Sequence, residues 1–300
     1  MTALEVPAAV DIRVRSLPIW QGDLSWEVLK GGLSNTSYMV GDGRTRVVVR
    51  LGEDYPFHHV YREREVMASK AAAHASFAPE VLDAAPGVMV SRFIDGKTYS
   101  GDDVRANIDR VATLVRRFHT EMPGHVSGAG FIFWVFAVIR DYAHTLTEGG
   151  SRLAERMPEF VALAESLEAL QVPLPIVYGH HDLLPANLID DGEKLWLIDF
   201  EYAGFGTAMF DLAGLASNAG FSQAEAEHLL GVYFDRTPDA NLIRSHAAMQ
   251  CASLLREAMW SMVSELYLNA PGADYVAYTA ENLAALEASL DAYQTRFGKV

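Results

Sequence analysis

The stretch Gly179–Gly204, GHHDLLPANLIDDGEKLWLIDFEYAG, decides how the rest of the chain is interpreted. It places an Asp at 182, an Asn five residues later at 187, and a second Asp at 199 after a hydrophobic run typical of a strand. Pro185 prevents a continuous helix between Asp182 and Asn187, so this spacer is predicted to be a loop. Acidic residues are common in proteins, but this order and spacing of them is not.

The three side chains meet the needs of phosphoryl transfer from ATP. That reaction requires a carboxylate near the acceptor hydroxyl and hard oxygen ligands for Mg²⁺ on the phosphates. An Asp, an Asn five residues later and a second Asp after a strand match the protein-kinase template. We therefore predict Asp182 as the catalytic base and Asn187 and Asp199 as Mg²⁺ ligands. The alternative, that Asp182 and Asn187 only cap a helix or form a turn, explains single residues but not the combination.

Two adjacent histidines precede Asp182. A metal site built on them would need a third ligand at suitable spacing, and none is found nearby. We interpret His180 as hydrogen-bonding support for the catalytic loop, and we expect His181 to be partly exposed near the acceptor. Asp182 remains the better placed base.

The chain before this stretch is rich in predicted β structure. Residues 24–51 hold β-rich runs separated by the turn Gly41–Gly43, which is a hairpin signal. Residues 59–75 have helical spacing, and residues 80–94 resume as two short strands. Residues 1–94 are therefore predicted to form a small β-rich lobe.

Beyond Asp95 the composition changes and the chain is predicted to be mainly helical. The predicted C-terminal lobe, residues 95–300, has one strand, at 195–200, and the apolar run 131–139 is interpreted as part of a buried helix. The predicted helices cover residues 107–122, 133–146, 156–170 and a series from 223 to the end. The whole is an α+β fold of two lobes.

The N-terminal lobe must then hold the nucleotide. No GxxxxGK[ST] is present, so a Walker-type loop is excluded. The run KGGLSNTSYMV lies in a predicted hairpin, where glycines let backbone amides approach phosphate oxygens. We predict that Gly32, Ser34 and Asn35 contact the nucleotide, although Gly-Gly before Ser-Asn is also an ordinary turn.

A cation ends the next strand of this lobe. Arg50 closes the run RVVVRL at the point where a kinase places its phosphate-binding Lys, and an arginine binds phosphate bidentately. A cation at this position calls for a carboxylate partner, and the following helix offers Glu63 and Glu65. A surface strand residue is the alternative for Arg50.

From about Trp26 onward, the chain resembles the choline/ethanolamine kinase branch of the aminoglycoside-phosphotransferase-like kinases, which have a protein-kinase-like fold. The motifs that carry the resemblance are GGLSNTSY, VVVRLG, GHHDLLPANLI, LIDFEYAGFGTAMFDLA and REAMWSMV followed by DYVAYTAENL. The resemblance implies ATP and Mg²⁺ as cofactors. It also implies Glu65 as the partner of Arg50, and adenine contacts at the hinge between the lobes: Arg92, Phe93 and Ile94.

The resemblance also implies an acceptor pocket. In the family an ammonium group sits among aromatic rings and carboxylates, which attract cations. Trp260 and Tyr278 match aromatic positions of that pocket, and Glu201 and Glu257 are the candidate carboxylates. Glu257 stands where better-known members carry a Trp, and Asn218 where they carry a Glu. These departures leave room for ethanolamine or another small amino alcohol beside choline.

Spacing alone favours other roles for some of these residues. Trp260 shares a helical stripe with Leu255 and Met259 that is typical of a core. Glu201 has the alternative role of orienting the metal-binding loop. Asp211 is predicted to brace the catalytic loop.

Composition limits the remaining classes of function. The chain has 300 residues, 50% of them hydrophobic and 21% charged, as in a soluble globular protein. The formal net charge of −15 argues against nucleic acid as a partner and is compatible with a cationic substrate. A single cysteine, Cys251, excludes an internal disulfide. With no signal peptide or spanning segment in the sequence, we predict a cytoplasmic protein without membrane insertion.

The sequence thus predicts an ATP-dependent kinase that phosphorylates the hydroxyl of a small cationic amino alcohol, choline or ethanolamine. The alternatives are a kinase for another hydroxylated amine, such as an aminoglycoside or thiamine, and an inactive nucleotide-binding scaffold. A scaffold should have lost the base or a metal ligand, whereas this chain keeps all three. Protein-kinase activity is disfavoured because no Ala-Pro-Glu or long activation segment follows Asp199. The oligomeric state is open, and a homodimer is compatible with the sequence.

Overall fold

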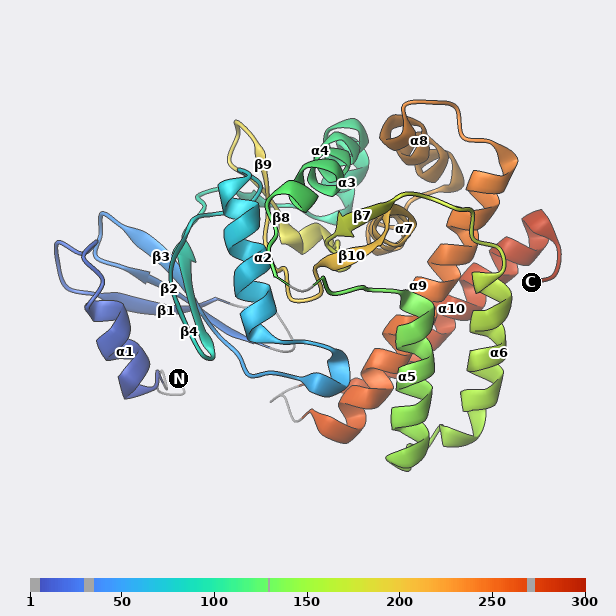
Figure 1. Ribbon diagram of the computed structural model, residues 1–300, viewed down its shortest axis with the longest axis horizontal. Helices are drawn as coiled ribbons and strands as arrows, with labels where there is room; N and C mark the ends of the chain where they lie inside the picture. Colours follow the sequence, from blue (N-terminus) through green and yellow to red (C-terminus); the bar gives the residue numbers. More distant parts are fainter. Residues whose placement is uncertain (1–5, 30–34, 129, 269–272) are drawn as a thin grey trace.

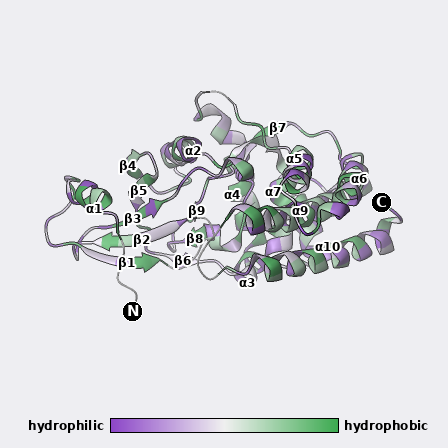
Figure 2. Ribbon diagram, turned by 90° about the horizontal axis from the view of Figure 1, so that it is seen from below, coloured by the Kyte–Doolittle hydropathy of each residue, from purple (hydrophilic) through white to green (hydrophobic). Residues whose placement is uncertain are grey.

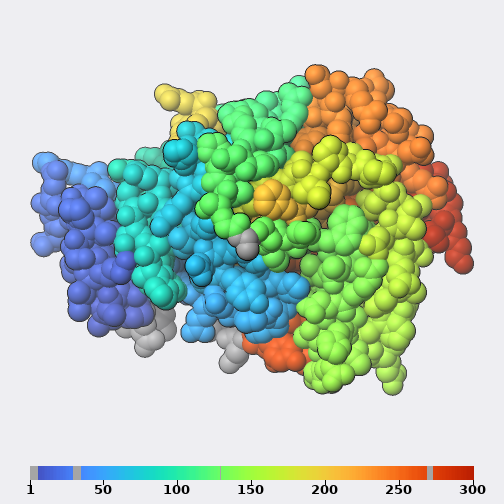
Figure 3. Space-filling model, viewed as in Figure 1, coloured from blue at the N-terminus to red at the C-terminus, as the bar shows by residue number. Residues whose placement is uncertain are grey.

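The computed structural model describes residues 6–29, 35–128, 130–268 and 273–300. A β-rich N-terminal part and a larger, mainly helical C-terminal part lie side by side (Figure 1). In the space-filling view the blue and cyan residues form one end of the molecule and the green to red residues the other (Figure 3). The predicted two-lobed α+β arrangement is confirmed.

The N-terminal lobe is built on an antiparallel sheet of order β1-β2-β3-β5-β4. Its valines alternate inward along the strands and pack against the buried side of α1 (Ala8–Arg15). The predicted hairpin turn joins β2 to β3, and the Asp42 carboxylate accepts the backbone N–H groups of Arg44 and Thr45 there. The strands are β1 (Ser25–Leu29), β2 (Thr36–Gly41), β3 (Arg46–Leu51), β4 (Val81–Ala85) and β5 (Val88–Arg92).

Helix α2 (Arg62–His74) joins this sheet to the other lobe. Its buried alanines, Ala68, Ala71 and Ala72, belong to the core that continues through the C-terminal lobe. The helix begins later than predicted because His59, after the 3₁₀ turn η1 (Pro56–His58), has φ 61° and Val60 pairs with Tyr55. This turn brings His58 into contact with the long helix α9 (Ala240–Tyr267) of the C-terminal lobe.

The C-terminal lobe is organised around its longest helix, α9, against which α5, α6, α7 and α10 pack. Figure 2 shows hydrophobic and hydrophilic residues alternating along α10, as expected of a helix with one packed face. Capping boxes begin α3 and α8. The helices are α3 (Gly101–Ala106), α4 (Ile108–Glu121), α5 (Val135–Glu148), α6 (Met157–Glu168), α7 (Ala208–Asn218), α8 (Gln223–Phe234), α9 (Ala240–Tyr267) and α10 (Tyr275–Phe297).

Short strands lie between these helices. Strand β7 (Ile176–Gly179) pairs with β10 (Gly204–Thr207), and β8 (Leu188–Asp190) pairs with both β6 (Lys97–Thr98) and β9 (Leu195–Leu197). The boundary that we propose at residues 94/95 therefore lies between the N-lobe sheet and the first strand of the C-terminal lobe. Among the described residues, no helix combines the length and the apolar character needed to cross a bilayer.

The predicted helix over the apolar run 131–139 is wrong in its first half. The backbone N–H of Phe133 donates to the Phe205 carbonyl, and the Phe205 N–H donates to the Phe131 carbonyl. These residues therefore extend alongside β10, and helix α5 begins only at Val135. Apolar composition could not distinguish the two forms, because a short apolar run is compatible with a helix or an extended segment.

Candidate active site

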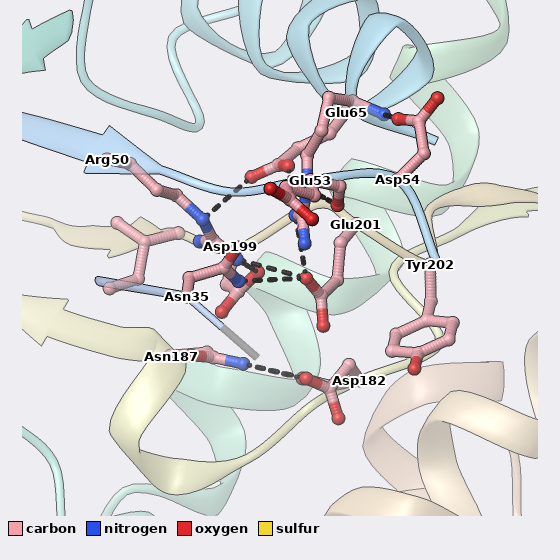
Figure 4. A network of polar contacts seen from close by, with 12 residues as sticks. Asn35, Arg50, Glu53, Asp54, Glu65, Asp182, Asn187, Asp199, Glu201 and Tyr202 are labelled. Atoms are coloured by element: carbon pink, nitrogen blue, oxygen red, sulfur yellow. Dashed lines mark hydrogen bonds and ion pairs between the residues drawn. The ribbon is translucent and has the colours of Figure 1, made fainter. Parts of the chain in front are cut away.

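The catalytic loop predicted from the sequence follows directly after β7. A one-turn 3₁₀ helix, η4 (Pro185–Asn187), reverses the chain, so that Asn187 faces Asp182 (Figure 4). Nδ2 of Asn187 donates to the backbone carbonyl of Asp182 at 2.8 Å and lies 3.4 Å from its Oδ2. Proline at the start of the turn removes a donor that the turn does not need. The structure therefore brings the predicted base and a predicted metal ligand together.

Asp211 of α7 braces this loop, as predicted. Its two carboxylate oxygens accept the backbone N–H groups of His180 and His181, each at 2.7 Å, and His119 Nε2 lies 2.8 Å away. Burial alone would raise the pKa of Asp211, but the bond to His119 and the nearby histidines hold it well below its ordinary value. The residue therefore stays ionised and fixes the backbone just before Asp182.

The two histidines of the loop are both buried. Nε2 of His180 donates to the Ile198 carbonyl at 2.9 Å, which ties the catalytic loop to the segment before Asp199. His181 is 2% exposed and stacks on Phe133 with ring centroids 4.4 Å apart. The prediction that His181 is partly exposed is wrong, although it does line the acceptor cavity. Burial lowers its pKa to about 4, so it is neutral at pH 7.

The second aspartate lies beyond the end of a strand. Asp199 has φ 69°, which interrupts regular pairing, so β9 ends at Leu197 and the predicted strand 195–200 is too long. The Asp199 side chain is 24% exposed. Its Oδ1 accepts a hydrogen bond from Arg50 Nη2 at 2.6 Å, and its Oδ2 makes none with the described residues.

Arg50 connects this aspartate to the N-terminal lobe. Its Nε lies 3.0 Å from Oε1 of Glu65, whereas Glu63 is exposed on the other side of α2. The pairing of Arg50 with Glu65 is confirmed, and the alternative of a surface strand residue is wrong. Burial opposes the charge of Arg50, but the surrounding carboxylates raise its pKa above the ordinary value. The cation is therefore held in place by carboxylates from both lobes.

Glu201 extends the same network between the lobes (Figure 4). Its Oε2 lies 2.9 Å from Arg62 Nη1, 3.2 Å from Arg50 Nη2 and 3.0 Å from Asn35 Nδ2. Arg62 also binds Glu65, one helical turn away. Glu201 lines the acceptor cavity, as predicted, but this oxygen is engaged by the N-terminal lobe. Glu201 thus connects the N-terminal lobe to the wall of the cavity.

The nucleotide predictions can be followed only in part. Gly32 and Ser34 lie outside the described residues. Asn35 is described, and its amide lies beside the carboxylate of Glu201 rather than in isolation. Its contact with the nucleotide stays a prediction.

The hinge predictions differ among their three residues. The Arg92 side chain is exposed and pairs with Glu80. The backbone N–H of Phe93 already donates to the Arg46 carbonyl, and the Arg46 guanidinium lies over the Phe93 ring. The backbone of Ile94 makes no hydrogen bond with the described residues. Of the three, Ile94 is the residue whose backbone N–H has no partner among the described residues, and its contact with adenine stays a prediction.

A cavity of about 270 Å³ opens beside the catalytic loop. The Glu257 carboxylate forms part of its wall, where Oε1 accepts from the Tyr278 hydroxyl at 2.9 Å and Oε2 from Arg256 Nη1 at 2.8 Å. The charged and aromatic side chains of the wall include Asp182, Glu201, Tyr202, Arg256, Glu257, Trp260 and Tyr278. The four predicted acceptor residues therefore share one cavity with the predicted base.

Trp260 combines the two roles that the sequence left open. Leu255 and Met259 are fully buried core residues on the same helix, and Trp260 is itself 7% exposed. Its Nε1 donates to the Tyr202 hydroxyl at 2.9 Å, and its ring stacks on His58 of the N-terminal lobe. Trp260 is therefore at the edge of the core, where it also lines the cavity.

Asn218 stands at the end of α7, facing the catalytic loop. Its Nδ2 donates to the backbone carbonyl of Leu183 at 3.3 Å. A glutamate at this position would bring a negative charge to that carbonyl, whereas an amide supplies a donor. The residue thus supports the loop from the acceptor side.

The pKa of Asp182 is raised well above the ordinary carboxyl range. Burial is the main cause, and the nearby carboxylates of Asp199, Glu201 and Glu257 add to it, while Arg256 acts in the opposite direction. A raised pKa makes a carboxylate a better proton acceptor for an alcohol. The environment therefore suits Asp182 to a base role.

Comparison with known proteins agrees with this geometry. The model of the phosphotransferase enzyme family matches residues 25–243. The chain belongs to this family. Its match to the protein LicA of Haemophilus influenzae is 25% identical over 218 residues, covering 69% of this chain and 62% of LicA, so the chain spans less than two thirds of that relative.

Matches to two further relatives include a larger share of each relative's length. A probable ethanolamine kinase of Arabidopsis thaliana is 27% identical over 277 residues, covering 80% of this chain and 72% of the relative. The crystal structure of a choline/ethanolamine kinase family protein from Mesorhizobium loti is 27% identical, with a TM-score of 0.77 and 94% of each chain covered. The predicted kinase-like fold of two lobes is confirmed.

The residues present fit Mg²⁺ bound together with ATP. Among the described residues, no group of three or more His, Cys, Asp or Glu forms a metal cage. Mg²⁺ that accompanies phosphates needs only one or two protein ligands, because phosphate oxygens and water complete its shell. Asp199 Oδ2 and the Asn187 side-chain oxygen make no hydrogen bonds with described residues, so both remain available as hard ligands.

Sequence reasoning missed several residues of the site. Tyr202 and Arg256 line the acceptor cavity, Arg62 pairs with Glu201, and His58 stacks on a cavity tryptophan. A signal existed for Arg62, since it stands three residues before Glu65 at the start of a helix. Nothing local marked His58, because its contacts are 84 and 206 residues away in the chain.

Proposed function

We propose that the protein is an ATP- and Mg²⁺-dependent kinase that phosphorylates the hydroxyl of a small amino alcohol, choline or ethanolamine. One observation carries the proposal: Asp182 lies in the wall of a small cavity that also contains carboxylates and aromatic rings. Such walls suit an ammonium group, and the base lies where the hydroxyl of the same molecule can reach it. The similarity to a probable ethanolamine kinase and to a choline/ethanolamine kinase family protein supports the same acceptor class.

Asp182 accepts the proton of the acceptor hydroxyl as that oxygen attacks the γ-phosphorus of ATP, and ADP leaves. Asn187 and Asp199 would hold Mg²⁺, which would neutralise charge on the phosphates. Arg50 supplies a further positive charge from the N-terminal lobe, and Glu65 orients it. Asp211 keeps the loop in the conformation that aims Asp182 at the acceptor.

The remaining nucleotide contacts are kept from the sequence. Gly32, Ser34 and Asn35 are our proposed phosphate contacts, because glycine amides and short polar side chains suit phosphate oxygens. Adenine lies against the hinge of Arg92, Phe93 and Ile94. The backbone N–H of Ile94 is the hinge donor that we assign to it.

The dimensions of the cavity favour a small acceptor. About 270 Å³ lies just below the range usual for drug-sized ligands, which favours a small acceptor over an aminoglycoside. Trp260 and Tyr278 supply aromatic surface, and Glu201 and Glu257 supply negative charge, for a compact ammonium group.

Location and assembly are proposed from weaker observations. The one cysteine, Cys251, is buried and unpaired, which is compatible with a reducing cytoplasm. We retain a homodimer as a proposal, and light scattering of the purified protein at several concentrations tests it.

The proposed function is tested by ATP consumption across a panel of acceptors. Purified protein with Mg²⁺ is given choline, ethanolamine, other amino alcohols, thiamine and aminoglycosides. We expect turnover with choline or ethanolamine that EDTA abolishes. Turnover with aminoglycosides or thiamine alone, or none with any acceptor, contradicts the proposal.

The base role has its own variant. Asp182→Asn should lower turnover by roughly 10²–10⁴-fold while leaving ATP affinity near that of the wild type. Asp191→Asn, in the turn between β8 and β9, is the matched control and should keep full activity. An Asp182→Asn protein with more than about a tenth of wild-type turnover would remove Asp182 from this role.

A further inference from the structure

The wall of the acceptor cavity contains a cation as well as carboxylates. Arg256 of α9 is 4% exposed, and its guanidinium carbon lies 4.6 Å from the centroid of the Tyr202 ring. Nη1 donates to Glu257, while Nε and Nη2 are buried without a hydrogen-bond partner among the described residues. A fixed arginine therefore occupies a position against an aromatic face that a substrate cation would also favour.

The aromatic surface of the cavity is largely covered by the protein itself. Tyr202 lies under Arg256 and is 5% exposed. Trp260 is stacked on His58, with centroids 4.8 Å apart and planes inclined by 21°. Tyr202 and Trp260 are thus buried, whereas the ring of Tyr278 in the same wall is partly exposed. A quaternary ammonium, which binds mainly through aromatic faces, therefore finds little open ring surface here.

Carboxylates remain available around the same space. Asp182 and Glu257 line the cavity, whereas Glu201 beside them is already engaged by the N-terminal lobe. A carboxylate has about four acceptor sites, so one that already accepts one hydrogen bond on each oxygen can accept more. A primary ammonium donates three hydrogen bonds to such groups, whereas a quaternary ammonium has no N–H to donate. The polar contacts of the cavity thus favour nitrogen that carries hydrogen.

We propose that Arg256 is a specificity-determining residue that covers Tyr202 and makes the cavity prefer a primary amino alcohol over its quaternary counterpart. The inference rests on the proposed kinase function and names the acceptor class within it. Arg256 also holds Glu257 in place, so the carboxylate meets the ammonium in a fixed orientation. The preference arises because the carboxylates of the cavity accept hydrogen bonds from N–H groups, and because Arg256 covers the aromatic ring that a quaternary ammonium would contact.

The test is a methylation series of one acceptor. Turnover is measured at saturating Mg²⁺·ATP with ethanolamine, N-methylethanolamine, N,N-dimethylethanolamine and choline, with serine as an additional acceptor. We expect kcat/KM to fall with each methyl group, and ethanolamine to exceed choline by about tenfold or more. The wild type by itself gives this result, so the test does not depend on a variant that folds.

Substitution of the arginine examines its part in the preference. Arg256→Met keeps a long side chain but removes the charge and the planar group, and should bring the ethanolamine-to-choline ratio about fivefold or more closer to unity, mainly through the acceptor KM. The KM for ATP should stay unchanged. Arg256→Lys, which keeps the charge but loses the planar group, provides a second variant. Arg152→Met, an exposed arginine paired with Glu265, is the control and should leave the ratio unchanged.

The outcomes separate the inference from the function on which it rests. Turnover of choline equal to or better than that of ethanolamine overturns the inference and leaves the kinase function standing. Serine preferred over ethanolamine overturns it also, because the unpartnered N–H groups of Arg256 would then serve an anionic group of the acceptor. An unchanged ratio in both Arg256 variants removes Arg256 as the determinant. Absence of turnover with every amine in the series overturns the proposed function and this inference with it.

Discussion

Substitution of Asp211 by Asn tests whether the catalytic loop is held by a single buried carboxylate. In the wild type both oxygens accept backbone N–H groups at 2.7 Å, from His180 and His181, and His119 lies 2.8 Å away. An asparagine keeps one acceptor oxygen and presents an NH₂ group to one of the two backbone donors. One charge-assisted bond is therefore lost and one buried N–H is left without a partner.

The magnitude follows from those two losses. A hydrogen bond to a charged group contributes about 1.5–3 kcal/mol, and an unsatisfied buried donor costs about 1–3 kcal/mol. The expected loss of unfolding free energy is thus about 2.5–6 kcal/mol, comparable to the lower part of the total that ordinary domains have. Because the strain falls on the two residues before Asp182, turnover should fall about 100-fold or more, whereas the KM for ATP should change little.

Urea denaturation and steady-state kinetics measure the two effects on one preparation of Asp211→Asn. Asp191→Asn is the matched control, because Asp191 also accepts two backbone N–H groups, from Glu193 and Lys194, but in an exposed turn. It should leave turnover unchanged. An Asp211→Asn protein within about 0.5 kcal/mol of wild-type stability and twofold of wild-type turnover would refute the bracing role.

Three further predictions concern metal, acceptor and pH. Asp199→Ala should weaken Mg²⁺-dependent ATP binding in calorimetry and lower turnover together, and unchanged Mg²⁺ dependence would exclude it as a ligand. Tyr278→Phe removes the hydroxyl that donates to Glu257 and should raise the acceptor KM by about tenfold, with the ATP KM unchanged; an unaltered acceptor KM would contradict this. Burial lowers the pKa of His246 to about 4, so below pH 6.5 the unfolded chain binds the proton more readily and stability falls. Between pH 7.5 and 5 this loss should be about 2 kcal/mol in urea denaturation, and His246→Gln should lack it; equal pH dependence of both proteins would show that His246 does not contribute.

Local sequence determined the chemistry of the catalytic loop. Asp182 and Asn187 are five residues apart across a proline turn, so their mutual contact depends on the turn alone. For the partner of Arg50 the residues alone offered both Glu63 and Glu65, and the family resemblance implied Glu65, which the structure pairs with it. The succession of a β-rich lobe and a helical lobe followed from hydrophobic periodicity, which is a property of neighbouring residues.

Tertiary structure decided which side chains of the two lobes contact one another. Glu201 binds Asn35, Arg50 and Arg62, which are 166, 151 and 139 residues away in the chain. The burial of His181 likewise depends on Phe133, a residue of a distant segment. Contacts of this kind need the whole packed core to bring the partners together, and no periodicity or spacing encodes them.

The acceptor cavity shows the same division. The sequence placed an arginine and a glutamate next to each other on a helix, at 256 and 257. Only the packing of α9 turned the arginine onto the ring of Tyr202 and into contact with Glu257. The direction in which a buried charged side chain points is set by the desolvation cost of every other arrangement, and that cost depends on neighbours from the whole fold.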